Sequence, residues 1–227
     1  MKTIIEKLYL RKIPHERGKL SFQHPAFKGT YGNVAKAIDK VGLKRPNSFE
    51  TASLVYNAFQ NKDGNYESKI IKILRNNWFG EFTGNLYLPK SNEEISNGVI
   101  LDLDSQNLKF ENGKLVMNKD SLIKRLKEKD PPVKFVSFGF KTKEQSSLEL
   151  SENPYIVARY GEEGADKIAK VADKYSNKPY LWSFKSVDEE KVRMSALCRL
   201  WSFDDRLLVG GGWGVGNRGH AFGVCKK

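Results

Sequence analysis

Glycine is concentrated near the C-terminus, and part of it forms a pattern known from nucleotide-binding proteins. Seven of the nineteen glycines fall between Gly210 and Gly223, and Gly214, Gly216 and Gly219 fit G-x-G-x-x-G. That pattern binds a dinucleotide where a strand precedes it, a helix begins on it and an acid follows about twenty residues later. No helix fits here and the sequence ends eight residues later, at Lys227. We therefore expect no dinucleotide cofactor.

Histidine and cysteine are scarce and do not have the spacing of metal ligands. The three histidines are His15, His24 and His220, the two cysteines are Cys198 and Cys225, and neither H-x-x-x-H nor C-x-x-C occurs. We expect no metal and no cofactor. A Cys–His nucleophile is conceivable, but buried strand cysteines are the favoured interpretation. An enzyme is thus the least favoured class, and the two cysteines could form one disulfide at most.

Two acidic pairs could do chemistry or serve structure. Asp102 and Asp104 would share one face of a strand, where paired carboxylates can bind a cation or transfer protons. Because the sequence offers no third ligand, we interpret them as solubilising residues of an edge strand. Asp204 and Asp205 are best explained as a turn between two strands.

The C-terminal segment differs chemically from the rest of the chain. Between Ser195 and Val224 the charged residues number five, and aromatic residues alternate with glycine. One interpretation is a β-hairpin with glycines at bends and tryptophans in the core. The other is a ligand-binding surface, in which glycine and asparagine give an adaptable backbone and aromatic, arginine and histidine side chains give contacts. Physical arguments alone leave both open.

The net charge suggests an acidic partner, but its distribution argues against one. The 227 residues include 39 Lys and Arg against 27 Asp and Glu, a net charge of +12. Nucleic-acid binding is therefore the alternative function. The basic residues are, however, scattered over the polar faces of expected helices, as on ordinary solvated surfaces. No apolar run is long enough for membrane insertion and no signal segment is visible, so we expect a cytoplasmic protein by default.

Helices are expected mainly in the first three quarters of the chain and short strands mainly at its end. Asn47 and Glu50 form a capping box, Asp120 can cap a short basic helix, and Pro154 and Gly161 interrupt a longer one. This order predicts an α+β fold. The expected helices cover 30–41, 47 to about 59, 69–76, 122–127 and parts of 144–175; the expected strands cover 85–88, 99–103, 114–117, 133–140, 179–184, 192–201, 206–211 and 220–226.

The glycine-rich segment resembles the variable region of proteins diversified by retroelements. The run Gly210–Val224 contains G-G-x-W-x-x-G followed by a small residue and A-F. Ser195–Leu197, Arg206–Leu207 and Ala221–Val224 are similar to the frame of such variable proteins from small-genome archaea and candidate-phylum bacteria. Phe138–Phe140 and Pro179–Lys185 extend the resemblance upstream.

The resemblance implies a C-type-lectin fold of the formylglycine-generating-enzyme-like kind, with helices packed on a small antiparallel sheet and a strand-rich insert. Residues 1–227 would form one such domain with accessory N-terminal and 85–140 elements, and 195–225 would be the variable region. In this family a retroelement copies a template repeat into the 3′ end of the gene and mutates adenines in the process, so that asparagine codons can become codons for many other residues. Neither calcium nor sugar is implied, since no suitable acid and amide set occurs. Relatives often continue past this core, so here 222–225 would have to serve as the last strand.

These expectations define a hypervariable ligand-binding protein that is not an enzyme, whose partner is an unknown ligand specific to the variant, expected to be a protein. Scaffold positions would be Ala196, Leu197, Leu207, Ala221, Phe222 and Val224. The exposed, diversified, ligand-binding positions would be Arg199, Trp201, Phe203, Leu208, Gly210, Gly212, Trp213, Gly214, Val215, Asn217, Arg218 and His220.

Overall fold

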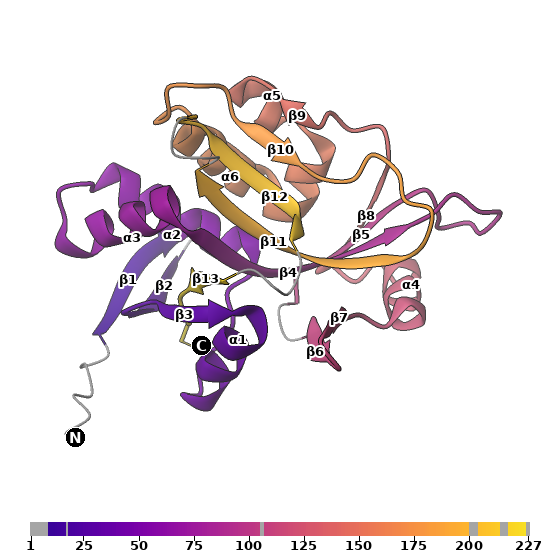
Figure 1. Cartoon of the computed structure of the whole chain (residues 1–227), viewed down its shortest axis with the longest axis horizontal. Coiled ribbons are helices and arrows are strands. Elements are labelled where there is room, and N and C mark those ends of the chain that lie inside the picture. Colours follow the sequence, from indigo (N-terminus) through magenta and orange to yellow (C-terminus); the bar gives the residue numbers. More distant parts are fainter. Residues whose placement is uncertain (1–8, 17, 105–106, 200–203, 214–217, 226–227) are drawn as a thin grey trace.

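The computed structural model describes residues 9–16, 18–104, 107–199, 204–213 and 218–225. Its main element is a nine-stranded mixed sheet with helices on both faces (Figure 1). The helices are α1 (Tyr31–Lys40), α2 (Ser48–Gln60), α3 (Asn65–Asn76), α4 (Lys119–Lys127), α5 (Ser147–Ser151) and α6 (Pro154–Ala172). The strands are β1 (Tyr9–His15), β2 (Gly18–His24), β3 (Phe27–Thr30), β4 (Trp78–Leu88), β5 (Gly98–Asp102), β6 (Lys109–Glu111), β7 (Lys114–Val116), β8 (Val133–Ser137), β9 (Lys143–Glu144), β10 (Tyr180–Trp182), β11 (Lys191–Arg199), β12 (Leu207–Trp213) and β13 (Arg218–Ala221).

The order of strands brings the two ends of the chain together. The sheet runs β3-β13-β4-β11-β12-β10-β9, and β5 and β8 extend it from β4. Strand β13 therefore lies between β3 and β4, antiparallel to one and parallel to the other. The α+β class is confirmed, although the sheet is larger than expected and contains parallel pairs.

Two apolar clusters cover the two faces of this sheet. On one face, side chains of α2 and α6 such as Val55 and Ile156 pack with Leu197 and Val209. On the other face, Val34 and Ile38 of α1 pack with strand residues such as Ala196. All six predicted scaffold residues are buried, which confirms that part of the prediction: Ala196, Leu197, Leu207, Ala221, Phe222 and Val224.

Most helix boundaries follow the local signals, although α3 begins at Asn65, four residues before the predicted start at 69. The Asn47 side chain accepts from the Glu50 N–H and Glu50 returns the bond, the predicted capping box. Pro154 begins α6, and Gly161 interrupts it at φ 69°. The predicted cap at Asp120 is wrong, because the helix begins one turn earlier and the Asn118 side chain accepts from the Ser121 N–H.

The chain end also departs from expectation. Residues 222–225 were expected to form the last strand, but that strand is β13, and Val224 makes only isolated bridges with Phe22 and Lys44. Phe222 stacks on Phe79 at 5.5 Å and lies 4.9 Å from the ring of His24. Packing of the Phe222 ring thus holds this part of the chain in place of the strand that was predicted over 222–225.

His24 should make the fold sensitive to acid. Its ring is 4% exposed between Tyr66 and Phe222, and burial lowers its pKa from 6.5 to about 4. The contribution of neutral, buried His24 to the stability of the fold is fully present above pH 6.5, where this residue is also neutral in the unfolded chain. It is lost as the pH falls towards 4, because the unfolded chain then binds a proton at His24 more readily than the folded chain does. From pH 7.5 to 4.5 we expect a loss of about 2–3 kcal/mol from this group. Urea unfolding of the wild type and His24→Phe across this range measures it, and parallel pH profiles would contradict it.

Candidate ligand-binding surface around strand β12

Strand β12 is the centre of the predicted binding region, and its residues alternate between two environments. It lies between β11, antiparallel, and β10, parallel. Leu207 and Val209 point into the cluster shared with α6, and a side chain at Gly211 would also point there. A side chain at Gly210 or Gly212 would instead point towards the opposite face, at Trp182. Odd positions of β12 therefore face the core, as expected for a strand.

The three consecutive glycines differ in the space around them. A Cβ atom at Gly211 would overlap the hydroxyl of Tyr155 and lie 2.9 Å from that of Tyr87. At Gly210 the nearest atom would be Leu208 Cδ2 at 3.2 Å, and at Gly212 it would be Trp182 Cζ3 at 3.1 Å. Both of those neighbours are ends of side chains, which can shift. Substitution is therefore excluded at 211 but sterically possible at 210 and 212.

The backbone of the glycine run is held from behind by buried side chains. Arg159 Nη1 donates to the carbonyl oxygen of Gly210 at 2.9 Å, and Tyr87 Oη donates to that of Gly211 at 2.9 Å. Arg159 is fully buried, and it pairs with the fully buried Glu81. Burial by itself lowers the Arg159 pKa, but Glu81 together with Tyr160 and Tyr155 outweighs this and the pKa is raised, so the guanidinium stays charged.

Further hydrogen bonds extend this network through the sheet. Tyr155 Oη donates to Asn85 Oδ1 at 2.7 Å, and Asn85 Nδ2 donates to Ser195 Oγ at 3.1 Å. Arg159 Nε donates to Ser48 Oγ at 3.1 Å. The register between β4 and β11 shifts where Met194 pairs with Gly84 and the next residue, Ser195, pairs with Glu81. This irregularity accompanies the polar side chains that lie inside an otherwise apolar core. Sequence reasoning did not identify them, because each partner lies far away in the chain.

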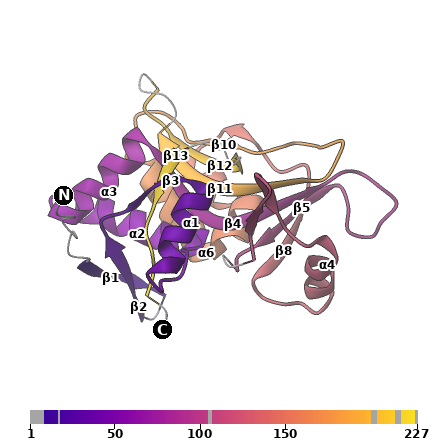
Figure 2. The ribbon, with the colours of Figure 1, turned by 60° about the horizontal axis from the view of Figure 1, so that its bottom comes forward.

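Trp182 and Phe184 lie beside Gly212, and two basic side chains of β11 lie near Phe184. Figure 2 shows β10, β11 and β12 along one side of the molecule, with no helix over the outer side of β10 and β12. Trp182 is 42% exposed there. Beyond it, Lys191 Nζ and the Arg193 guanidinium lie 5.8 and 5.7 Å from the centre of the Phe184 ring. The predicted site began at residue 199 and therefore missed Trp182 and Phe184, although the upstream resemblance included both.

Seven of the twelve predicted binding positions cannot be placed fully. Trp201, Phe203, Gly214, Val215 and Asn217 lie outside the described residues, and only the strand backbone is described for Trp213 and Arg218.

The exposure predicted for three other positions is wrong. Leu208 is 4% exposed, and Gly210 and Gly212 are buried as well. Trp182, from outside the variable region, lies over the two glycines, and the Leu208 side chain folds towards Gly210.

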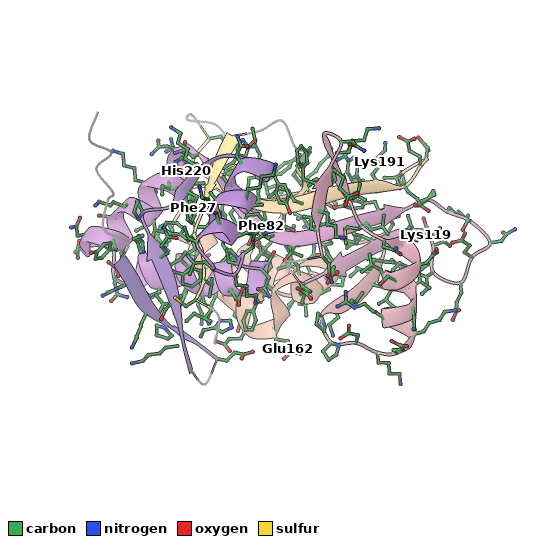
Figure 3. All side chains as sticks on the ribbon, turned by 90° about the horizontal axis from the view of Figure 1, so that it is seen from below. Phe27, Phe82, Lys119, Glu162, Lys191 and His220 are labelled. Atoms are coloured by element: carbon green, nitrogen blue, oxygen red, sulfur yellow. The ribbon has the colours of Figure 1, made fainter. Side chains whose placement is uncertain are left out.

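The two remaining positions, Arg199 and His220, are half-buried and lie on different strands. Arg199 Nη1 is 3.8 Å from Asp205 Oδ1 at the far end of β11. His220 lies in β13 opposite Lys28, and burial and that lysine lower its pKa. Figure 3 shows His220 near Phe27 and Phe82, far from Lys191 and Lys119 at the other end of the molecule. The described positions lie on β11, β12 and β13; β12 pairs directly with β11, and β4 separates β13 from β11.

Asp102 and the two cysteines were the other residues whose types could do chemistry, and Asp102 has a structural role. Asp102 is 1% exposed and accepts hydrogen bonds from Arg125 and Asn107, so the solubilising role is wrong. Strand β5 is paired on both sides and is not an edge. Cys198 and Cys225 are both free. Among the described residues no three His, Cys, Asp or Glu side chains are grouped as metal ligands, and no helix is long and apolar enough to cross a bilayer.

Comparison with known proteins supports the fold. No protein-family description matches the chain, and no curated protein matches it. A solved structure described as "Accommodation of massive sequence variation in Nanoarchaeota by the C-type lectin fold" superposes with a TM-score of 0.60. The match has 16% sequence identity and covers 88% of this chain and 97% of the other. The chain therefore has a C-type lectin fold.

Proposed function

We propose that this protein is a hypervariable ligand-binding protein and not an enzyme. Its region 195–225 would be diversified by a retroelement, and its ligand would be a protein specific to each variant. The glycine-rich resemblance and a lectin fold like that of a protein described as accommodating massive sequence variation support the proposal.

The observation that carries the proposal is the alternation along β12. Core-facing Val209 is fully buried and a Cβ at Gly211 would overlap Tyr155, whereas the atoms nearest to a Cβ at Gly210 or Gly212 are side-chain ends. The backbone between them is fixed by Arg159 and Tyr87, whose hydrogen bonds involve carbonyl groups and not the variable side chains. Because β12 is held through its backbone, residues on its side away from α6 could be substituted while the backbone keeps its conformation.

The genetic part of the proposal is tested by sequencing the DNA downstream of the gene. We expect a near-copy of the 3′ end that differs at adenines, beside a reverse-transcriptase gene. A neighbourhood with neither would contradict diversification by a retroelement, although the chain could still bind a ligand.

The binding part is tested with two displayed libraries. One randomises Gly210 and Gly212 together with 200–203 and 214–217; the matched library randomises Val209 and Gly211. We expect most members of the first to fold and to yield binders when selected against a panel of unrelated proteins. We expect most members of the second to be lost in a protease-resistance screen. Equal folding losses in both libraries, or no binders from folded members of the first, would contradict the proposal.

A further inference from the structure

A cavity lies away from the predicted variable region, beside α3. It has a volume of about 570 Å³ and is lined by Phe59, Lys62, Asp63, Ser68, Ile71, Arg75 and Lys174. Phe59 comes from α2, and Ser68, Ile71 and Arg75 share one face of α3 because they are three and four residues apart. Phe59 and Ile71 are half-buried, whereas Lys62 and Lys174 are exposed at the rim. The cavity thus has an apolar floor and a charged edge.

Positive charge exceeds negative charge around this cavity. Lys62, Arg75 and Lys174 line the cavity with a single carboxylate, that of Asp63, and a second carboxylate, Asp205, lies outside the lining beside Arg75. In the part of the chain that the structure describes, neither lysine forms an ion pair within 4 Å. Arg75 Nη1 is 3.7 Å from Asp205 Oδ1, too far for a hydrogen bond, and Nη2 donates to the carbonyl oxygen of Lys174. The rim is therefore complementary to an anion.

A buried polar group without a partner lies behind the arginine. Tyr175 is 7% exposed, and its hydroxyl has no hydrogen-bond partner among the described residues. Its ring packs against Phe59 at 6.1 Å and under the Arg75 guanidinium at 5.1 Å. Burial raises the pKa of Tyr175, so its hydroxyl remains a donor. Tyr175 does not itself line the cavity, but its ring supports Phe59 and Arg75, which do.

We propose that this cavity binds a small anionic amphiphile. The apolar body would lie on Phe59 and Ile71, and a carboxylate or phosphate head group would lie among Lys62, Arg75 and Lys174. None of the lining residues falls within 195–225, so the ligand would be the same for every variant of the chain. The inference does not depend on the proposed function of the variable region.

Isothermal titration of the full chain tests the site with four probes below their micelle concentrations: octanoate, octyl phosphate, inorganic phosphate and octyltrimethylammonium. We expect the first two to bind with one-to-one stoichiometry and inorganic phosphate to bind at least about tenfold more weakly, because it lacks the apolar body. The cationic amphiphile should not bind. Comparing octanoate with octyl phosphate identifies the preferred head group.

The double variant Lys62→Gln/Lys174→Gln should weaken binding of the anionic amphiphiles about tenfold. The matched control Lys69→Gln/Lys72→Gln removes the same charge from exposed positions of α3 outside the cavity and should bind as the wild type does. Circular dichroism would verify that both are folded. No binding, equal binding of the cationic probe, or equal losses in the two double variants would overturn the proposal.

Discussion

Replacing Gly211 with alanine should lower the free energy of unfolding by about 3 kcal/mol or more. The new methyl group would overlap the Tyr155 hydroxyl, and it would lie 2.8 Å from Tyr155 Cζ and 2.9 Å from Tyr87 Oη. Neither tyrosine can move easily, because Tyr155 donates to Asn85, and Tyr87 lies within hydrogen-bond distance of Ser183 and donates to the Gly211 carbonyl. Relief of the overlap would therefore break buried hydrogen bonds.

The adjacent glycines supply the controls. Gly210→Ala and Gly212→Ala should each change the free energy of unfolding by less than about 1 kcal/mol, since the nearest atoms are movable side-chain ends and alanine restricts the unfolded chain. Urea unfolding of the three variants measures the differences. Three similar losses in the free energy of unfolding would contradict the prediction that the space around the Cβ atom distinguishes Gly211 from Gly210 and Gly212.

The second large effect concerns the buried ion pair. Arg159→Met should destabilise the fold by about 4 kcal/mol, because it leaves the fully buried Glu81 carboxylate without its cation. The same change removes the hydrogen bonds to the Gly210 carbonyl and to Ser48. Much of the loss should return in the double variant Glu81→Met/Arg159→Met, which buries no charge.

Chemical denaturation of both single variants and the double variant forms a complete cycle. If Arg159→Met alone does not fold, a cooperative unfolding transition in the double variant would still show that Glu81 and Arg159 are coupled. Losses that simply add in the double variant would contradict a coupled pair. The lysine variant Arg159→Lys should fall between wild type and methionine, since it keeps the charge but cannot reach all three partners.

The sequence predicted those parts of the fold that local signals determine. The Asn47 capping box, the break at Gly161 and burial of the scaffold residues were all visible as short-range patterns. No element was predicted before 30, yet β1 and β2 occupy 9–24. In β1, Pro14 and several charges disrupt the alternation that identifies a strand, and pairing with β2 compensates.

The candidate site was less predictable, because its environment is made by distant residues. The tail pattern led to Gly210 and Gly212 being predicted as binding positions and Gly211 being left out, in keeping with alternation along a strand. It could not show that Trp182 from β10 lies over Gly210 and Gly212, since this contact requires the parallel pairing of β10 with β12. Likewise, buried Glu81 and Asn85 are polar residues in a strand, and only their partners on α6 and β11 explain them.

The position of β13 has a consequence for how the chain is made. Residues 218–221 insert between strands β3 and β4, which the ribosome completes long before. Until the last strand is synthesised, the earlier sheet has a gap between β3 and β4, and Arg159 lacks the Gly210 carbonyl as an acceptor. The sheet between β3 and β4 can therefore close only after residues 218–221 have been synthesised, so this part of the fold forms late although β3 and β4 are made early.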